Sequence, residues 1–380
     1  MRFSPTSDLL LYADSARNPD MRYFSGIHVP DAFIAFQSKR KRIGIFNALE
    51  YGRALKESSL DQVLPLEPLR ESAKQRWRTP NPSLADIILV AAGRLRIRHC
   101  FVADDFPAAL FMKLKKRGLR IDTAHAPILP SREIKSASEA RAIRAANGIS
   151  AAGIRAAERM LSESRIKGRN LIHRGRTLTS EMLRMAIEIA CIEAGGVSID
   201  TIAAGGDQAC DPHHRGSGPI RPHELIIIDV FPKANKSSYH GDMTRTFLKG
   251  RANDAQRSLV EAVASAQKKA LRLITSGANG REVHRACDEE FRRRGYETKS
   301  TPRGSVGFFH GTGHGLGLAV HELPRISGMV DSELRAGAVV TVEPGLYYPG
   351  IGGCRIEDVV QVTSGRPRML SSYPYRWEIR

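Results

Sequence analysis

The sequence predicts two domains, an α/β domain over residues 1–130 and an α+β domain over residues 131–380. Three observations support this prediction. A chain of 380 residues exceeds the length of one average domain. In its first part, short apolar runs alternate with amphipathic segments, which is typical of an α/β domain. In its second part, the order helix, helix, strands occurs twice, which is a weak sign of internal duplication and would place a site between the two halves.

In the first domain, four short apolar runs are expected to form strands and one amphipathic segment is expected to form a helix. The expected strands cover residues 32–36, 42–46, 87–90 and 99–102, and the helix covers 107–118. The turn-rich stretch from Ala126 to Pro130 interrupts this pattern. We therefore expect the domain boundary there.

The second domain begins with a long alanine-rich segment whose apolar residues recur at helical spacing. Helices are expected at residues 136–164, 179–194, 254–275 and 280–294, and strands at 199–203, 225–231, 242–247, 310–314, 338–342 and 355–362. A glycine follows the second of these helices at Gly195 and the fourth at Gly295, where helices commonly end.

Composition is typical of a soluble protein, with 42% hydrophobic and 26% charged residues. No apolar run is long enough for a membrane span, and no secretory signal is recognisable, so a cytoplasmic location is expected. The five cysteines are scattered, which favours reduced thiols. The net charge of +18 raises the question of an acidic partner. Because the excess is spread over both predicted domains, nucleic-acid binding is not expected as a main function.

Two acids, Asp229 and Asp242, lie at the ends of strongly apolar strand-like runs. A carboxylate is costly to bury there unless it is paired or binds a cation. In a hairpin the two acids would lie on one side as hard oxygen ligands. Taken alone, they could equally form salt bridges in this arginine-rich chain.

Three further motifs carry candidate ligands, namely GTGHGLG at residues 311–317, TVEPG at 341–345 and GGCRIED at 352–358. His314 lies among glycines, which allow close backbone approach, while Glu343 and Glu357 adjoin apolar strands. One imidazole and four carboxylates suit a pair of divalent manganese, cobalt, iron or zinc ions. Such a pair could hold a bridging hydroxide and polarise a carbonyl.

The order Asp, Asp, His, Glu, Glu in these settings resembles the pita-bread metallopeptidases, which comprise creatinase, aminopeptidase P, prolidase and methionine aminopeptidase. The resemblance covers residues 135–362, and DMRYFSG at residues 20–26 is similar to the creatinase-type N-terminal domain. It implies a creatinase-like N-terminal domain and a pita-bread catalytic domain with pseudo-twofold halves. It also implies that Asp229 binds one metal, that Asp242 and Glu357 bridge both, and that His314 and Glu343 complete the other.

The same resemblance implies roles for other side chains. His213, in DPHH at residues 211–214, would contact the scissile amide nitrogen, and His321 would hydrogen-bond the carbonyl oxygen. The neighbouring His214 is an alternative to His213. His310 and Arg355 match substrate-binding residues of the proline-specific branch. Glu343 is the candidate for carrying the proton to the departing amine.

The resemblance implies an exopeptidase that cleaves Xaa-Pro bonds at the N-terminus of peptides or in dipeptides, and is closest to Xaa-Pro aminopeptidase or Xaa-Pro dipeptidase. We expect two divalent metal ions per subunit, with manganese favoured, and a homodimer. We expect no membrane partner. The alternatives are a non-catalytic pita-bread module that binds protein or nucleic acid, and a hydrolase of another small amide.

The sequence departs from the family pattern between the first two acids. Twelve residues, 230–241, separate Asp229 from Asp242, where much of the family has ten. Because Gly241 and Asp242 still open a strand-like run, we expect the additional residues in the hairpin turn and not at the metals.

Overall fold

The computed structural model describes residues 3–4, 6–125, 127–302 and 304–380. Ala126, the first residue of the turn-rich stretch, lies outside the described residues. The chain forms two compact units, unit 1 over residues 1–132 and unit 2 over residues 133–380. No helix in the described ranges is both long and apolar enough to cross a membrane.

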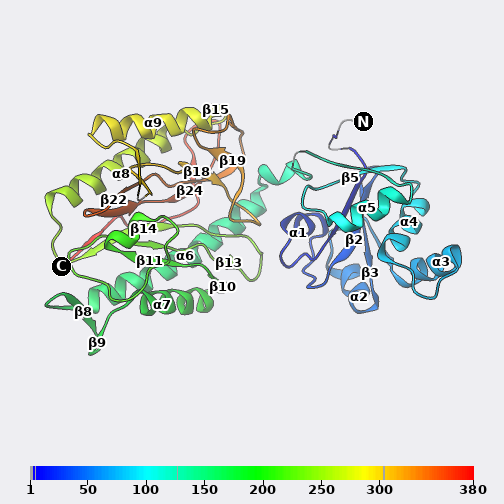
Figure 1. The fold of residues 1–380 in the computed structure, drawn as a ribbon, viewed down its shortest axis with the longest axis horizontal. Coiled ribbons are helices and arrows are strands. Elements are labelled where there is room, and N and C mark those ends of the chain that lie inside the picture. Colours follow the sequence, from blue (N-terminus) through cyan, green and yellow to red (C-terminus); the bar gives the residue numbers. More distant parts are fainter. Residues whose placement is uncertain (1–2, 5, 126, 303) are drawn as a thin grey trace. The chain divides into compact units, whose positions relative to one another are not determined.

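Unit 1 is built on a six-stranded mixed sheet with the order β4-β3-β2-β1-β5-β6. Its strands are β1 Leu9–Ala13, β2 Phe33–Ser38, β3 Lys41–Phe46, β4 Gln62–Pro65, β5 His99–Val102 and β6 Arg120–Thr123. Its helices are α1 Pro19–Ser25, α2 Ala48–Glu57, α3 Glu67–Trp77, α4 Leu84–Arg94 and α5 Ala108–Lys116 (Figure 1). Strand β2 runs antiparallel to both β1 and β3, whereas β3–β4, β1–β5 and β5–β6 are parallel. The predicted strands at 32–36, 42–46 and 99–102 and the helix at 107–118 are therefore confirmed.

The strand predicted at residues 87–90 is wrong, because these residues lie inside helix α4. Ser83 begins this helix with a capping box, in which its hydroxyl accepts from Asp86 N and the Asp86 carboxylate accepts from Ser83 N. The helix is buried on most sides, so its apolar run carries no helical periodicity that would distinguish it from a buried strand.

Unit 2 contains two helix pairs with sheets between them (Figure 1). The first pair is α6 Ala137–Glu163 and α7 Ser180–Glu193, and the second is α8 Asp254–Leu273 and α9 Gly280–Arg293. Strands β11 Ile202–Gly205, β12 Ile226–Asp229, β14 Thr244–Lys249 and β26 Glu378–Ile379 form one sheet. Strands β19 Glu322–Ile326, β18 Gly313–Gly315, β21 Val339–Val342, β24 Asp358–Gln361 and β25 Arg368–Met369 form the other, in that order.

The remaining elements of unit 2 are short. The hairpin β22 Gly345–Tyr348 and β23 Gly352–Arg355 lies beside the first sheet, where β23 contacts β12 and β14. The other strands are β7 Arg165–Lys167, β8 Asn170–His173, β9 Arg176–Thr177, β10 Gly196–Val197, β13 Lys233–Ala234, β15 Ala278–Asn279, β16 Lys299–Thr301, β17 Gly304–Val306 and β20 Glu333–Leu334. The 3₁₀ helices are η1 Pro130–Glu133, at the junction of the units, and η2 Gly206–Cys210.

The four helices predicted for unit 2 are confirmed, with ends that differ by one or two residues. Helix α6 begins with a capping box between Ser136 and Glu139 and buries a stripe that includes Ile143 and Ile154. Its apolar face packs with α7 against the first sheet, where Ile226, Ile228 and Phe247 complete a common core. The helix-helix-strand order thus recurs in space, as the sequence indicates.

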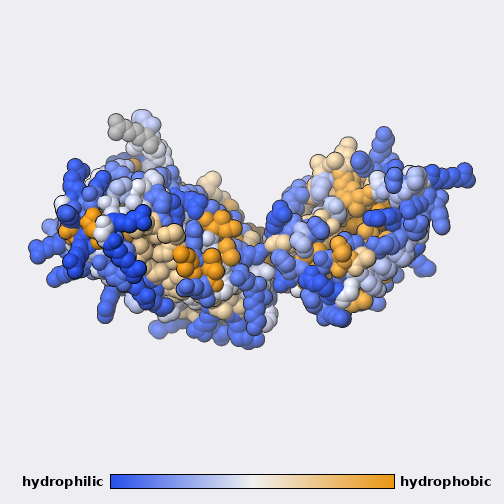
Figure 2. All heavy atoms as spheres, turned by 90° about the horizontal axis from the view of Figure 1, so that it is seen from below, coloured by the Kyte–Doolittle hydropathy of each residue, from blue (hydrophilic) through white to orange (hydrophobic). Residues whose placement is uncertain are grey.

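Helix α7 also carries apolar side chains on its outer face. Met185, Ile189 and Ile192 are 59%, 50% and 60% exposed, and they share one helix face because they are spaced by four and three residues. Figure 2 shows hydrophobic side chains gathered over the part of unit 2 in which α7 lies. We call these three residues the α7 stripe.

Candidate metal centre

A cavity of about 680 Å³ in unit 2 brings together every site residue predicted from the sequence. Its lining includes Asp229, Asp242, His314, Glu343 and Glu357, together with His213, His310, His321 and Arg355. These nine residues come from separate segments of the chain. Their convergence in one cavity is the main structural finding of the site.

The hairpin β12–β14 supplies two of the carboxylates. Asp229 ends β12 and lies opposite Thr244, and the register remains unbroken out to the Lys233–His240 pair. Asp229 and Asp242 are therefore diagonal neighbours on the same face of the hairpin. The turn begins beyond that pair, so the additional residues lie at its tip and do not displace either acid.

Helix α6 fixes the position of Asp242. Asn147, which is 1% exposed, accepts a hydrogen bond from the Asp242 backbone N–H at 3.1 Å. A side chain at Gly241 would approach the Ala146 carbonyl to 2.4 Å. Only glycine lets the strand lie this close to the helix, which explains the glycine before this acid.

Glycines also determine the setting of His314 in strand β18. A Cβ at Gly313 would lie 2.0 Å from the Thr341 carbonyl, and one at Gly315 would lie 2.0 Å from the Leu323 carbonyl. The His314 Nδ1–H points to the Gly315 carbonyl at 3.1 Å. This bond fixes a proton on Nδ1 and turns Nε2 toward the cavity, so Nε2 is the nitrogen that a metal ion would take in place of its proton.

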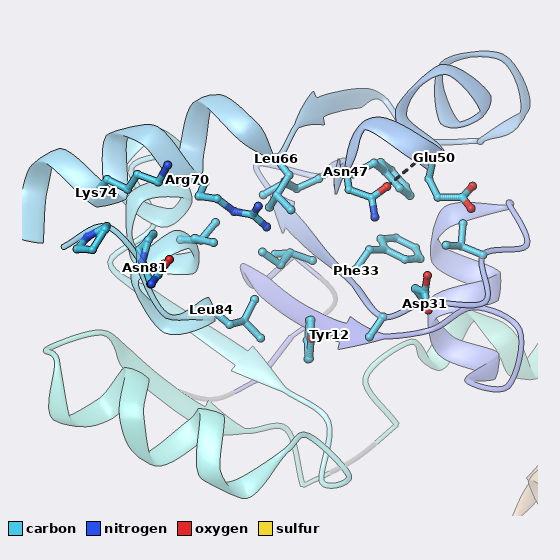
Figure 3. Close-up of a pocket in the computed structure, with 18 residues that line it drawn as sticks. Tyr12, Asp31, Phe33, Asn47, Glu50, Leu66, Arg70, Lys74, Asn81 and Leu84 are labelled. Carbon is cyan, nitrogen blue, oxygen red and sulfur yellow. Dashed lines mark hydrogen bonds between the residues drawn. The ribbon is translucent and has the colours of Figure 1, made fainter.

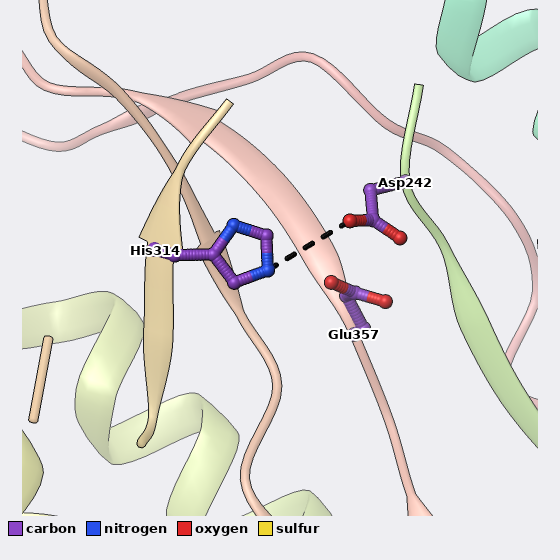
Figure 4. A group of neighbouring side chains, drawn as sticks. All are labelled: Asp242, His314 and Glu357. Atoms are coloured by element: carbon purple, nitrogen blue, oxygen red, sulfur yellow. Dashed lines mark ion pairs between the residues drawn. The ribbon is translucent and has the colours of Figure 1, made fainter. Parts of the chain in front are cut away.

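Three ligand atoms form a compact buried group. One ligand atom each from Asp242, His314 and Glu357 lies within 4.8 Å of the other two. Figure 4 shows the three side chains directed toward one another. His314 Nε2 is 3.9 Å from Asp242 Oδ2 and 3.1 Å from Glu343 Oε1. The Thr341 hydroxyl accepts from His314 N and donates to Glu343, while the Thr244 hydroxyl donates to Glu357 at 2.8 Å.

Burial and mutual repulsion act on the carboxylates. Burial, followed by the charge of Asp229, raises the pKa of Asp242 well above its ordinary value, and burial together with the Asp242 charge does the same for Glu357. Burial also raises the pKa of Asp229, although Arg355 opposes that shift. Several acids that repel one another in a dry cavity are the environment in which a bound cation relieves the cost of burial.

Two further observations fit a cation. Asp229 Oδ1 is buried and has no hydrogen-bond partner within the described part of the chain. Burial lowers the pKa of His314, but its hydrogen bond and ion pair with Glu343 outweigh burial and raise it to about 8. The same pair, against the effect of burial, lowers the pKa of Glu343 to about 2. The donor set of one imidazole and four carboxylates therefore fits divalent metal ions.

Asp229 also forms a salt bridge, the alternative to metal binding that the sequence left open, and its partner is Arg355. Its Nη2 donates to Asp229 Oδ2 at 2.7 Å, Nη1 to the Tyr347 hydroxyl at 2.9 Å, and Nε to the Thr244 hydroxyl at 3.3 Å. The guanidinium is 3% exposed. It uses its fixed fork of donors to hold one carboxylate and one phenol in place.

The histidines occupy different parts of the cavity. His310 Nε2 is 2.8 Å from the Tyr347 hydroxyl, and the rings of His321 and His314 are 4.5 Å apart, edge to face. Desolvation lowers the pKa of His310 and of His321 to about 4, with the charge of His314 adding to the shift at His321. His213 is exposed on the cavity wall, whereas the His214 ring accepts a hydrogen bond from Gly216 N in a local turn.

Sequence reasoning missed four residues that hold the site together, namely Asn147, Thr244, Thr341 and Tyr347. Thr244 and Thr341 are polar residues within apolar strands, which is a weak signal of a buried hydrogen bond. Asn147 is a buried polar residue in an alanine-rich helix and gives a similar signal. Tyr347 carried no signal, because a tyrosine beside glycine and leucine is ordinary in a strand.

Comparisons with known proteins identify the family to which the chain is similar. The sequence pattern of metallopeptidase family M24 (Peptidase_M24) matches residues 141–364. The chain is 37% identical over 175 residues to an Xaa-Pro dipeptidase of Pyrococcus furiosus, a match that covers 46% of this chain and 47% of that relative. It is 35% identical over 181 residues to the putative dipeptidase YkvY of Bacillus subtilis. The chain thus matches about half the length of these curated relatives.

Solved structures extend the likeness to nearly the whole chain. The prolidase of Pyrococcus horikoshii OT3 superposes with a TM-score of 0.78 at 26% identity, over 98% of this chain and 95% of that one. The Xaa-Pro dipeptidase of Bacillus anthracis superposes with a TM-score of 0.80 at 25% identity, with the same coverage. The fold is therefore prolidase-like, with an N-terminal α/β domain before the catalytic domain, and the chain belongs to metallopeptidase family M24.

Proposed function

We propose that the protein is a metal-dependent exopeptidase that hydrolyses Xaa-Pro bonds at the N-terminus of peptides or in dipeptides. The observation that supports this proposal most is the buried convergence of Asp242, His314 and Glu357, with Asp229 and Glu343 lining the same cavity. The activities after which the relatives are named, Xaa-Pro dipeptidase and prolidase, support the substrate class.

The five carboxylate and imidazole side chains would hold two divalent cations, manganese first, with Asp242 and Glu357 shared between them. Bound there, such cations supply a water of near-neutral pKa and polarise the substrate carbonyl. A peptide could approach from the side of the cavity lined by His213 and His321, because both residues are exposed.

The side chains of this chain would then perform the remaining steps. Glu343 is ionised at neutral pH, since its pKa is lowered to about 2, and its Oε1 is occupied by His314 and Thr341. Its second oxygen, Oε2, would accept the proton of the attacking water and return it to the departing amine nitrogen. His321, neutral because its pKa is lowered to about 4, would donate an N–H hydrogen bond to the carbonyl oxygen.

The proposed substrate explains the remaining polar groups. A proline nitrogen within a peptide has no hydrogen to donate, so its bond needs a dedicated site. His213, on the cavity wall, would contact that nitrogen, and His310 would bind the substrate from the Tyr347 side. Arg355 lines the cavity, but its three donor groups are directed to Asp229, Tyr347 and Thr244, so we assign it to positioning these groups.

We also propose a homodimer and a cytoplasmic location. The α7 stripe supports the homodimer, because large apolar side chains on an outer helix face are favourable to cover with a second copy.

The first experiment strips the purified protein with a chelator and restores it with Mn²⁺ or Co²⁺. Release of the first residue is then measured from an Xaa-Pro dipeptide and from a tripeptide with proline second. Restored cleavage supports the proposal, and the preferred length separates the dipeptidase from the aminopeptidase activity. Two equivalents of bound metal without cleavage would direct the search to other amides, and no metal binding would refute the proposal.

Three variants sharpen this test. His213→Ala should lower turnover by about 10²–10³-fold, the range for loss of one stabilising group in a transition state, whereas the neighbouring His214→Ala should lower it far less. Glu357→Gln should abolish metal-restored activity and lower the bound metal, which is read independently by equilibrium dialysis. Equal effects of the two histidine variants would contradict the assigned role of His213.

A further inference from the structure

A second cavity, of about 480 Å³, lies in unit 1 at one edge of the six-stranded sheet (Figure 3). Its lining includes Tyr12 from β1, Phe46 at the end of β3, and Leu66 directly after β4. Strand β2 is antiparallel to β1 and β3, and β4 is parallel to β3, so β1, β3 and β4 all end at this edge. In open α/β sheets, the carboxyl ends of such strands are where ligands bind.

The cavity combines an apolar floor with polar side chains around it. Its apolar lining includes Phe33, Ile34, Ile45, Phe46, Leu66, Leu84 and Ile87. The side chains of Asn47 and Asn81 add amide groups. Asn47 Oδ1 accepts from Glu50 N as a helix cap, so its NH₂ group remains available to a ligand. Apolar walls with a few polar groups, in a volume of some hundreds of cubic ångströms, are typical of small-molecule sites.

Two opposite charges in this lining have no partner among the described residues. Arg70 and Asp31 make no side-chain hydrogen bond or ion pair within the described part of the chain, although other charged lining residues do. Glu50 pairs with Arg53 at 2.7 Å, and Lys74 pairs with Glu71 at 2.7 Å. Arg70 and Asp31 are thus the unpaired charges that face the cavity.

These two charges lie apart. In Figure 3 the Arg70 guanidinium extends into the cavity from the α3 side, whereas Asp31 lies toward the opposite end, near Phe33 and Glu50. A ligand that satisfies both must carry a negative group at one end and a positive group at the other.

We propose that this cavity binds a short zwitterionic compound, namely a free α-amino acid or a dipeptide with apolar side chains. Arg70 binds the carboxylate in a charge-assisted hydrogen bond, and Asp31 binds the ammonium group. The apolar side chain lies over the floor formed by Phe33 and Leu84. The site is in unit 1, its residues are separate from the metal ligands of unit 2, and the inference does not depend on the proposed peptidase activity.

The test is calorimetric titration of the full-length, chelator-treated protein with leucyl-leucine, N-acetyl-leucyl-leucine and leucyl-leucine amide. Chelation prevents any hydrolysis at the metal centre. The free dipeptide should bind, and each blocked form should bind at least tenfold more weakly, because each lacks one of the two charges. Arg70→Gln and Asp31→Asn should each weaken the free dipeptide at least tenfold.

Arg76→Gln is the matched control, because Arg76 lies on the same helix but outside this cavity. It should leave the affinity unchanged, and thermal melting of each variant verifies folding. Equal affinities in Arg70→Gln and Arg76→Gln would overturn the proposal, since the dipeptide would then bind elsewhere, for example at the metal centre. Arg70-dependent binding of inorganic phosphate without binding of the dipeptide would overturn the ligand class.

Discussion

Replacement of Arg355 by lysine tests how the candidate metal centre is held together. The substitution keeps the charge but replaces a rigid fork with a single ammonium group. The guanidinium donates to Asp229, Tyr347 and Thr244, all in a buried setting. A lysine that retains the contact with Asp229 leaves the other two acceptors without this donor, and a lost buried hydrogen bond costs about 1–3 kcal/mol.

The expected loss of unfolding free energy is therefore about 2–4 kcal/mol for the metal-free protein, since the weaker 3.3 Å contact counts for less than the 2.9 Å contact. Replacement of a residue that orients a metal ligand also typically lowers metal affinity by about 10–100-fold. Urea unfolding of the chelated protein measures the first quantity, and Mn²⁺ titration measures the second.

Arg325→Lys is the matched control, because Arg325 lines the same cavity but makes no side-chain hydrogen bond among the described residues. It should change the unfolding free energy by less than about 0.5 kcal/mol, as surface substitutions do. If Arg355→Lys matched this control in both stability and metal affinity, the positioning role of Arg355 would be refuted.

Four further outcomes are expected. Tyr347→Phe should cost about 1–3 kcal/mol in urea unfolding, because it leaves the buried donor of Arg355 unpaired; no loss would contradict this. Asp358→Asn should lower the unfolding free energy by about 3–5 kcal/mol in urea unfolding, because the carboxylate pairs with buried Arg245 at 2.9 Å. The control Glu282→Gln removes an exposed ion pair and should lower it by less than about 1 kcal/mol. Hydrogen bonding from Arg293 lowers the pKa of Glu290 to about 2, although desolvation opposes this shift. The ionised Glu290 therefore stabilises the fold above pH 4.5, and this stabilisation is lost as the pH falls toward 2. In urea unfolding, Glu290→Gln should lower the unfolding free energy by about 1–2 kcal/mol at neutral pH, a range reduced because Arg293 is exposed, and the difference from the unchanged protein should vanish near pH 2. Ile189→Asp should convert a dimer to a monomer in analytical ultracentrifugation, with exposed Met329→Asp as the control, and an unchanged dimer would place the interface elsewhere.

Sequence reasoning succeeded where one physical signal dominates. Helix α6 has a capping box and a continuous apolar stripe, so its ends were predicted to within a residue. It failed at residues 87–90, because a short run of isoleucine, leucine and valine on a helix that is buried on most sides has no periodicity to read. The capping pair of Ser83 and Asp86 was the available signal.

The candidate ligands were predictable for a different reason. Acids beside apolar strands and a histidine among glycines are costly patterns that a fold retains for a purpose. The groups that hold these ligands were not predictable, because Asn147 and Tyr347 reach the site through packing between segments far apart in the sequence. Such contacts depend on the three-dimensional arrangement of the two halves, which no local pattern encodes.

The division of the ligands between the two halves of unit 2 also bears on kinetics. Asp229 and Asp242 come from the hairpin after α7, while His314, Glu343 and Glu357 follow α9. Because closing such long loops costs chain entropy, we expect these contacts to form late in folding, after both sheets have been built. A bound cation would then stabilise the native state but not the folding transition state. Its main effect would be to slow unfolding, while refolding proceeds at the metal-free rate. Stopped-flow unfolding with and without Mn²⁺ measures this lifetime directly, and an accelerated refolding rate would show that the centre assembles early.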